Sequence, residues 1–245
     1  MGKTKYIFFD IDGTLSFDKQ NIGEKNAEYI KKVQSLGHKV FINTGRSFAY
    51  LPENIKNALC WNGIVAGSGY IIYEGQVIYN KTLSVPSLEA IYNYCKKRNI
   101  MCLFEGVERL YSNMPNPNTS YNIDDFLPMR EELHITKVTV DAEIPPEDIP
   151  VLKGVNVISM PGYFEGVPEG HDKDTGLKII QSYCGISRED LIAFGDSLND
   201  KAMLKYAGTS VIMRHAPQEL DKYAAIRTNL DHEGVAEGLS LIFGI

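Results

Sequence analysis

An apolar run near the N-terminus ends in two carboxylates, and this feature constrains the fold more than any other. Residues 6–9 read Tyr-Ile-Phe-Phe without a polar interruption. Such a run is typical of a strand buried on both faces, as in a parallel sheet covered by helices. Asp10 and Asp12 follow at once, within a segment that reads Asp-Ile-Asp-Gly-Thr. The sequence therefore predicts a central parallel strand with two carboxylates at its carboxyl end.

Further strand and helix patterns alternate in both halves of the chain. Residues 24–36 have the apolar spacing of a helix, and 39–43 resemble a second strand that runs into Thr44-Gly45-Arg46. Near the C-terminus, the apolar run 191–194 precedes Gly-Asp-Ser-Leu-Asn-Asp, and a helix is expected over 234–243. This alternation predicts an α/β fold with a Rossmann-like doubly wound parallel sheet. Ligands of such sheets bind at the carboxyl ends of the strands.

The middle of the chain follows a different pattern. A helix is expected around 88–95, and strand-like pieces lie at 100–104, 109–112, 134–140 and 155–160. Residues 114–118 contain two prolines and predict a loop, whereas 145–148 resemble a helix start. We therefore expect a core made of residues 1–82 and 169–245, with an inserted α+β cap over 83–168.

The two aspartates at the first strand end suit phosphoryl transfer. Two neighbouring buried carboxylates repel each other, and a divalent cation relieves that repulsion. One carboxylate can attack phosphorus to form an aspartyl-phosphate, and a second can protonate the leaving alcohol and later activate water. A simple turn at Asp12-Gly13 would explain the same residues without any chemistry.

Other polar residues occupy equivalent places along the chain. Thr44 and Arg46 can hold phosphoryl oxygens, and Lys173 precedes a helix expected over 175–183. Asp196 and Asp200 flank a turn after another apolar strand, where a hard cation finds oxygen ligands. Each feature alone has an ordinary explanation as a turn, a solvated lysine or a helix cap. Their joint occurrence in this order is much harder to explain by chance.

These segments together resemble the haloacid dehalogenase-like superfamily, in its Cof-type sugar-phosphatase branch. The resemblance spans nearly the whole chain apart from the insert, which matches only in length and position. The four matching motifs are Asp10-Ile11-Asp12-Gly13-Thr14-Leu15, Asn43-Thr44-Gly45-Arg46, Lys173-Asp174-Thr175-Gly176-Leu177 and Gly195-Asp196-Ser197-Leu198-Asn199-Asp200.

The resemblance implies a role for each motif. Asp10 would be the nucleophile and a metal ligand, and Asp12 the general acid and base that also binds the metal through its backbone carbonyl. Mg²⁺ is the expected cofactor, bound directly by Asp196 and supported by Asp200. The residues expected to bind phosphate or substrate are Thr44, Gly45, Arg46, Lys173 and Asn199. Two segments depart from the usual pattern of the family, namely His171-Asp172 and Asp174 around Lys173, and Arg214-His215 before Ala216.

The insert is expected to act as a lid that excludes water and selects the substrate. Candidate lid residues are Glu105, Arg109, Tyr111 and Tyr163, although packing explains each of them more readily than substrate contact. His134 and His171 are lone histidines, for which a ligand role is not expected.

The preferred hypothesis is a Mg²⁺-dependent phosphatase that hydrolyses a small phosphorylated metabolite, with sugar phosphates the first candidates. One alternative is a phosphomutase of the phosphomannomutase type, which must retain a bisphosphate and so needs basic lid residues. The insert offers Lys96, Lys97, Arg98, Arg109 and Arg130, but three of these cluster at one helix end. A non-catalytic binding protein on the same fold is the other alternative.

Composition excludes several other classes. The net charge of −6 argues against a nucleic-acid surface, and the chain has no run of apolar residues long enough to span a membrane. The four cysteines lack the spacing of a metal or redox motif, which favours reduced thiols and a cytoplasmic protein. A monomer or a homodimer is expected.

Overall fold

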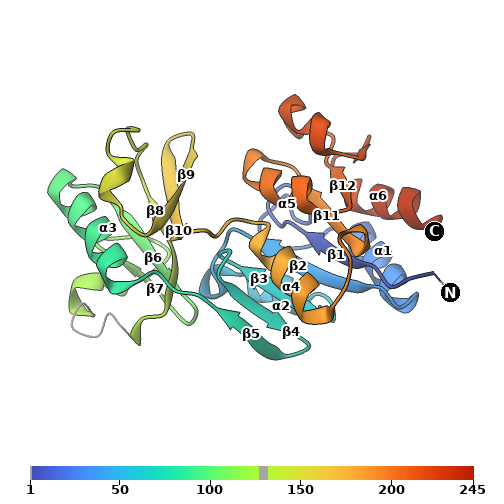
Figure 1. The fold of residues 1–245 in the computed structure, drawn as a ribbon, viewed down its shortest axis with the longest axis horizontal. Coiled ribbons are helices and arrows are strands. Elements are labelled where there is room, and N and C mark those ends of the chain that lie inside the picture. Colours follow the sequence, from blue (N-terminus) through green and yellow to red (C-terminus); the bar gives the residue numbers. More distant parts are fainter. Residues whose placement is uncertain (1, 127–131) are drawn as a thin grey trace.

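The structure is a computed structural model that describes residues 2–126 and 132–245. Its two lobes are each built around a separate sheet (Figure 1). The larger sheet has eight strands in the order β13-β12-β11-β1-β2-β3-β4-β5, and the smaller has five in the order β7-β6-β8-β10-β9. The predicted doubly wound core with a separate α+β cap is therefore confirmed.

The larger sheet is parallel except for one edge hairpin. Its strands are β1 (Tyr6–Phe9), β2 (Lys39–Thr44), β3 (Gly63–Ala66), β4 (Tyr70–Tyr73), β5 (Gln76–Asn80), β11 (Leu191–Gly195), β12 (Thr209–Ile212) and β13 (Ile226–Arg227). The run from β13 to β3 is parallel, whereas β4 and β5 pair in an antiparallel manner. The sequence interpretation had missed β3, β4, β5 and β13. The β4–β5 turn at Glu74-Gly75 has positive φ at both residues, and it lacks the Asn-Gly or Asp-Gly pair that marks such turns.

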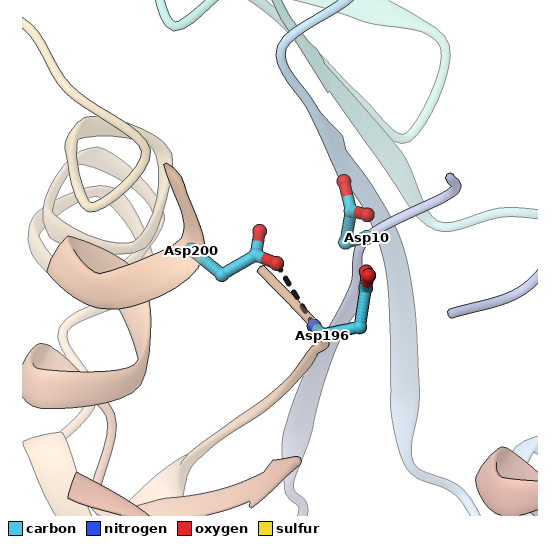
Figure 2. A group of neighbouring side chains, drawn as sticks. All are labelled: Asp10, Asp196 and Asp200. Atoms are coloured by element: carbon cyan, nitrogen blue, oxygen red, sulfur yellow. Dashed lines mark hydrogen bonds between the residues drawn. The ribbon is translucent and has the colours of Figure 1, made fainter. Parts of the chain in front are cut away.

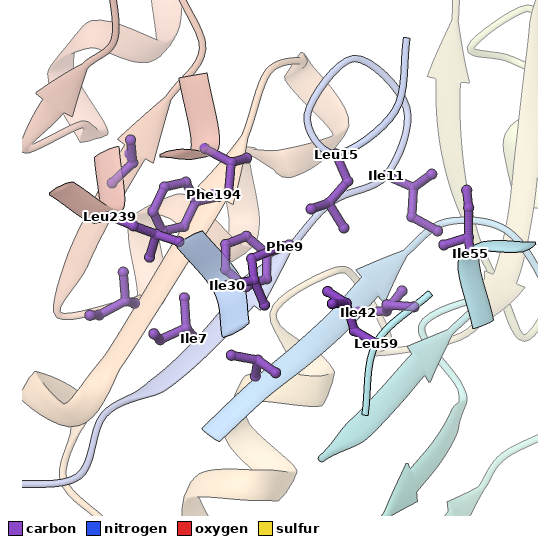
Figure 3. Close-up of a cluster of buried hydrophobic side chains, with 14 of the residues drawn as sticks. Ile7, Phe9, Ile11, Leu15, Ile30, Ile42, Ile55, Leu59, Phe194 and Leu239 are labelled. Carbon is purple, nitrogen blue, oxygen red and sulfur yellow. The ribbon is translucent and has the colours of Figure 1, made fainter. Parts of the chain in front are cut away.

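Burial on both faces explains the continuous apolar run of β1. Ile7 and Phe9 belong to a cluster on the side of α1 (Glu24–Ser35) and α6 (Gly234–Phe243), part of which is shown in Figure 3. Phe8 faces the opposite cluster, which includes residues of α4 (Thr175–Cys184) and α5 (Lys201–Tyr206). The short α2 (Glu53–Asn57) adds Ile55 to the first cluster. Helices on both faces leave the strand ends as the accessible edge of the sheet.

The smaller sheet is wholly antiparallel and is covered on one face by α3 (Val85–Arg98). Its strands are β6 (Cys102–Gly106), β7 (Leu110–Ser112), β8 (Ile135–Val140), β9 (Val155–Met160) and β10 (Tyr163–Pro168). The strand β10 was not predicted. The expected helix start at 145–148 leads only to one 3-10 turn, Ile149–Val151, because Pro150 lacks the N–H that a longer helix needs.

Three further sequence expectations can be compared with the structure. In the part of the chain that is described, no helix is long and apolar enough to cross a membrane. All four cysteines are free thiols. Leu83 packs in the apolar cluster of the smaller lobe and β10 ends at Pro168, but the domain boundaries at 83 and 168 stay a prediction.

The close packing of α4 on β3 gives a test of the fold. A Cβ added at Gly176 would lie 2.6 Å from both γ-carbons of buried Val65. We predict that Gly176→Ala lowers the free energy of unfolding by about 1–3 kcal/mol, the usual cost of overpacking, as measured by urea denaturation. The control Ser182→Ala, at an exposed position of the same helix, should change it by less than about 0.5 kcal/mol. Equal stabilities of the two variants would contradict this packing.

Candidate active site

The carboxyl ends of β1, β2 and β11 meet at one edge of the large sheet. Phe9 lies opposite Ile42 on one side and Phe194 on the other, so the residues that follow these strands gather there. The backbone N–H of Asp10 donates to the carbonyl of Phe194 (3.0 Å), which extends the β1–β11 pairing to the first carboxylate. Parallel strands therefore bring together motifs that are far apart in the sequence.

Three carboxylates from two of these strand ends form a compact group. One oxygen from each of Asp10, Asp196 and Asp200 lies within 4.8 Å of the others (Figure 2). All three residues are buried, with Asp10 only 3% exposed. Burial raises the pKa of Asp10 well above its usual value despite the opposing Lys173, and it raises the pKa of Asp196 to about 6. A divalent cation placed at this carboxylate group would offset the repulsion between its members, and carboxylate oxygens are ligands that fit Mg²⁺.

The backbone at Gly13 and its contact with Asp196 require glycine at that position. Gly13 has φ +86°, and a Cβ there would lie 2.4 Å from Oδ2 of Asp196. The next residue, Thr14, donates from its hydroxyl to Oδ1 of Asp196 (3.0 Å). The loop after β1 thus contacts Asp196 directly and fixes its carboxylate beside Asp10.

Lys173 joins two of the carboxylates. Its ammonium donates to Oδ1 of Asp10 (2.6 Å) and to Oδ1 of Asp200 (2.5 Å). Burial alone would lower the pKa of Lys173, but the two carboxylates outweigh that effect and raise it. Asn43 at the end of β2 binds the carbonyl of Lys173 (2.9 Å) and so fixes its backbone. These contacts hold the lysine as a cation next to Asp10.

Both carboxylate oxygens of Asp200 accept hydrogen bonds. While Oδ1 binds Lys173, Oδ2 accepts from the backbone N–H groups of Asp196 (2.9 Å) and Ser197 (3.0 Å). Gly195 permits this approach, because a Cβ there would lie 2.7 Å from Cβ of Asp200. The geometry suits Asp200 as a support for Asp196 and Lys173 better than as a direct metal ligand.

The Asp12 carboxylate lies apart from the carboxylate group and pairs with Arg46. The guanidinium binds it at two points, with Nε 2.8 Å from Oδ2 and Nη2 2.5 Å from Oδ1. Asp12 is half-exposed at the cavity, whereas the Arg46 side chain is mostly buried. The Arg46 guanidinium therefore orients the Asp12 carboxylate, while phosphate binding by Arg46 stays a prediction. The backbone of Asp12 remains for the metal role predicted from the sequence.

The remaining phosphate-binding candidates border the same cavity. Thr44 is 1% exposed, and its hydroxyl accepts from the N–H of Arg46 (3.1 Å), which leaves its proton free to donate. The carbonyl of Gly45 accepts from Lys137 of the smaller lobe (2.8 Å). Asn199 accepts from Ser197 (2.7 Å) and lies 3.4 Å from the Lys173 ammonium.

A cavity of about 440 Å³ lies between the lobes and joins these residues to the smaller sheet. Two of the four candidate lid residues, Glu105 and Tyr163, line it. Arg109 instead lies over the ring of Tyr121, and Tyr111 is buried in the core of the smaller lobe. The cavity-lining residues that sequence reasoning missed are Lys19, Tyr50, Met101, Leu103, Asn116, Asn118, Lys137, Thr139, Met160, Glu165 and Ser197.

The structure shows the contacts of Asp174 and His215, two of the residues that depart from the motif pattern. Asp174 pairs with Lys178 one helical turn later (2.6 Å), so it does not contact the Lys173 ammonium. His215 places its Nε2 3.4 Å from Oδ2 of Asp196. The lone His171 binds the Tyr79 hydroxyl (2.7 Å), and His134 is exposed.

Comparisons with known proteins identify the family of this chain. A family model described as haloacid dehalogenase-like hydrolase matches residues 7–239. A 5-amino-6-(5-phospho-D-ribitylamino)uracil phosphatase of Bacillus subtilis is 27% identical, and the alignment covers 99% of both chains. A phosphoglycolate phosphatase of Methanopyrus kandleri is 27% identical over 95% of this chain and 94% of its own.

Similar solved structures include phosphatases of the same fold. The subclass IIB sugar phosphatase BT4131 superposes with a TM-score of 0.81 at 26% identity, covering 98% of this chain and 99% of its own. The phosphatase BT1666 of Bacteroides thetaiotaomicron has a TM-score of 0.86 at 24% identity, covering 99% and 96%, which shows the shared fold. The protein described here belongs to the haloacid dehalogenase-like hydrolase family and is an enzyme, as its four motifs predicted.

Proposed function

We propose that the protein is a Mg²⁺-dependent phosphatase that hydrolyses a small phosphorylated metabolite through an aspartyl-phosphate on Asp10. The observation that carries this proposal is the contact of 2.6 Å between Asp10 and the buried Lys173 ammonium, beside the carboxylate group and at the cavity. The names of the relatives support it, since two act on a ribitylaminouracil phosphate and on phosphoglycolate, and a structural neighbour is a sugar phosphatase.

The proposed reaction has two steps, formation of the aspartyl-phosphate and its hydrolysis. A carboxylate oxygen of Asp10 attacks phosphorus and displaces the alcohol, which takes a proton from Asp12. Asp12 then removes a proton from water, which attacks the same phosphorus, so that inorganic phosphate leaves and Asp10 is restored. Lys173 and Thr44 hold the phosphoryl oxygens during both steps.

Asp10 and Asp196 would hold Mg²⁺, with Asp200 supporting Asp196. The cation supplies charge neutralisation, so that an anionic carboxylate can approach an anionic phosphate. The two-point contact with Arg46 orients Asp12 towards the cavity for proton transfer.

The charges of the lid argue against the phosphomutase alternative. Lys137 is the one lid cation that lines the cavity within residues 2–126 and 132–245, and it faces two lid carboxylates, Glu105 and Glu165. The basic residues at 96–98 lie at the end of α3 outside the cavity, and Arg130 lies outside the described residues. A bisphosphate would find little positive charge under this lid. A cytoplasmic location and a monomeric or homodimeric state stay predictions.

Asp10→Asn tests the nucleophile. We predict that it lowers kcat for any phosphate ester by at least about 10³-fold, because an amide cannot form the covalent intermediate. Released phosphate is the measurement, and circular dichroism checks the fold. The control Asp141→Asn, at an exposed lid position, should retain the activity of the native protein. Near-native turnover by Asp10→Asn would exclude covalent catalysis by this residue.

Metal removal tests the cation site. EDTA should abolish phosphate release, and added Mg²⁺ should restore it. Mg²⁺ should also raise the melting temperature, because a cation that binds the folded carboxylates stabilises that state. The variant Asp196→Asn should lose most of this thermal shift. A full shift in Asp196→Asn would place the cation elsewhere.

Arg46→Lys tests the orientation of Asp12. An ammonium is a single point charge and cannot reproduce the two-point guanidinium contact. We expect kcat to fall about tenfold or more, whereas KM should change little if Arg46 does not bind the phosphate. A rise in KM at constant kcat would instead indicate that Arg46 holds the substrate.

A further inference from the structure

The lid wall of the cavity contains three interacting charged residues on three adjacent strands. The Lys137 ammonium on β8 lies 2.6 Å from Oε1 of Glu165 on β10 and 3.8 Å from Oε1 of Glu105 on β6. It also donates to the carbonyl of Gly45 in the larger lobe (2.8 Å). Two carboxylates thus share one ammonium, which leaves one negative charge uncompensated.

The pairing of the strands puts these residues on the cavity side of the small sheet. Glu105 lies directly opposite Lys137, and Glu165 lies opposite Thr139, two residues along the same strand. Neighbours such as Val138 and Phe104 point into the apolar cluster under α3. The side chains that alternate with them line the cavity.

Their burial makes the excess charge costly. Glu105 is 1% exposed and Lys137 is 4% exposed, and an apolar trio of the same volume would stabilise the fold at least as well. The ammonium donates hydrogen bonds to the Gly45 carbonyl and to Oε1 of Glu165, whereas Oε1 of Glu105, 3.8 Å away, is beyond hydrogen-bond distance. Lys137 is therefore held by hydrogen bonds to Glu165 and Gly45, and Glu105 adds an ionic contact without a hydrogen bond.

The acceptors of the cluster are not all used. Glu105 accepts from Thr139 (2.6 Å) and from the backbone N–H of Ser47 (3.4 Å), which fix its position. Oε2 of Glu165 has no hydrogen-bond partner among the residues that the structure describes, and this side chain lines the cavity. The lid thus offers a fixed, negatively charged acceptor across the cavity from Asp10.

We propose that Glu165, held by Lys137 and backed by Glu105, determines which leaving groups the enzyme accepts. It accepts a hydrogen bond from a hydroxyl or amino group of the leaving alcohol, and it repels a leaving group that carries a carboxylate or second phosphate. The substrate class is then a monophosphate of a neutral or amino-bearing polyol. This inference rests on the proposed function, because it places the phosphoryl group at Asp10.

The test compares kcat/KM, with Mg²⁺, for a hexose monophosphate against two anionic leaving groups, those of phosphoglycolate and a hexose bisphosphate. The native enzyme should prefer the hexose monophosphate by about tenfold or more, the usual effect of one charged hydrogen bond. In Glu165→Gln this preference should fall towards unity, with a higher KM for the monophosphate and a lower KM for the anionic esters. The control Glu147→Gln removes an exposed lid charge outside the cavity and should keep the native preference.

The outcomes separate this inference from the proposed function. Equal kcat/KM for all three esters in the native enzyme would overturn the inference even if Glu165→Gln failed to fold, while the phosphatase activity itself would stand. An unchanged preference in a folded Glu165→Gln would overturn it as well. If the native enzyme hydrolysed neither these esters nor p-nitrophenyl phosphate, the proposed function would fail, and the inference would fail with it.

Discussion

The ammonium of Lys173, placed between the carboxylates of Asp10 and Asp200, is the interaction on which the rest of the site depends. Buried carboxylates repel one another and lose their hydration, so a group of three is unfavourable without positive charge. Lys173 supplies part of that charge from the segment just before α4, and the cation expected at Asp10 and Asp196 would supply the rest. Removal of either charge would leave the others uncompensated in the protein interior.

The fold holds this arrangement through features that are not themselves catalytic. Gly13 and Gly195 permit approaches that a side chain would block, and Gly176 lets α4 lie close to β3 so that Lys173 reaches the strand ends. Asn43 binds the backbone of Lys173 from the end of β2. These backbone and polar contacts hold the charged side chains in place.

The core and the motif residues could be predicted because local patterns encode them. The apolar run of β1 indicated a strand buried on both faces, and the polar residues after β1, β2 and β11 indicated where these strands end. Glu105 and Tyr163 were among the candidate lid residues, but Lys137 and Glu165 could not be found in this way. Lys137 and Glu165 are single polar residues in strands whose partners are distant in sequence, and only the pairing of β6, β8 and β10 brings them together. The only available signal was the alternation of these polar residues with apolar neighbours along each strand. That alternation does not distinguish a side chain that lines a cavity from one that faces solvent. The contact of Arg46 with Asp12 was missed for a related reason, because it depends on the loop after β1.

The central claim is that Asp10 becomes covalently phosphorylated. Its most direct test is mass spectrometry of an Asp12→Asn variant that has been mixed with p-nitrophenyl phosphate, whose leaving group needs no proton from Asp12, and quenched rapidly in acid. Loss of the general base should slow hydrolysis of the intermediate, so that it accumulates. The account predicts the added mass of one phosphoryl group on the peptide that contains Asp10. Continued turnover with no modified peptide, or with the phosphoryl group on another residue, would contradict it.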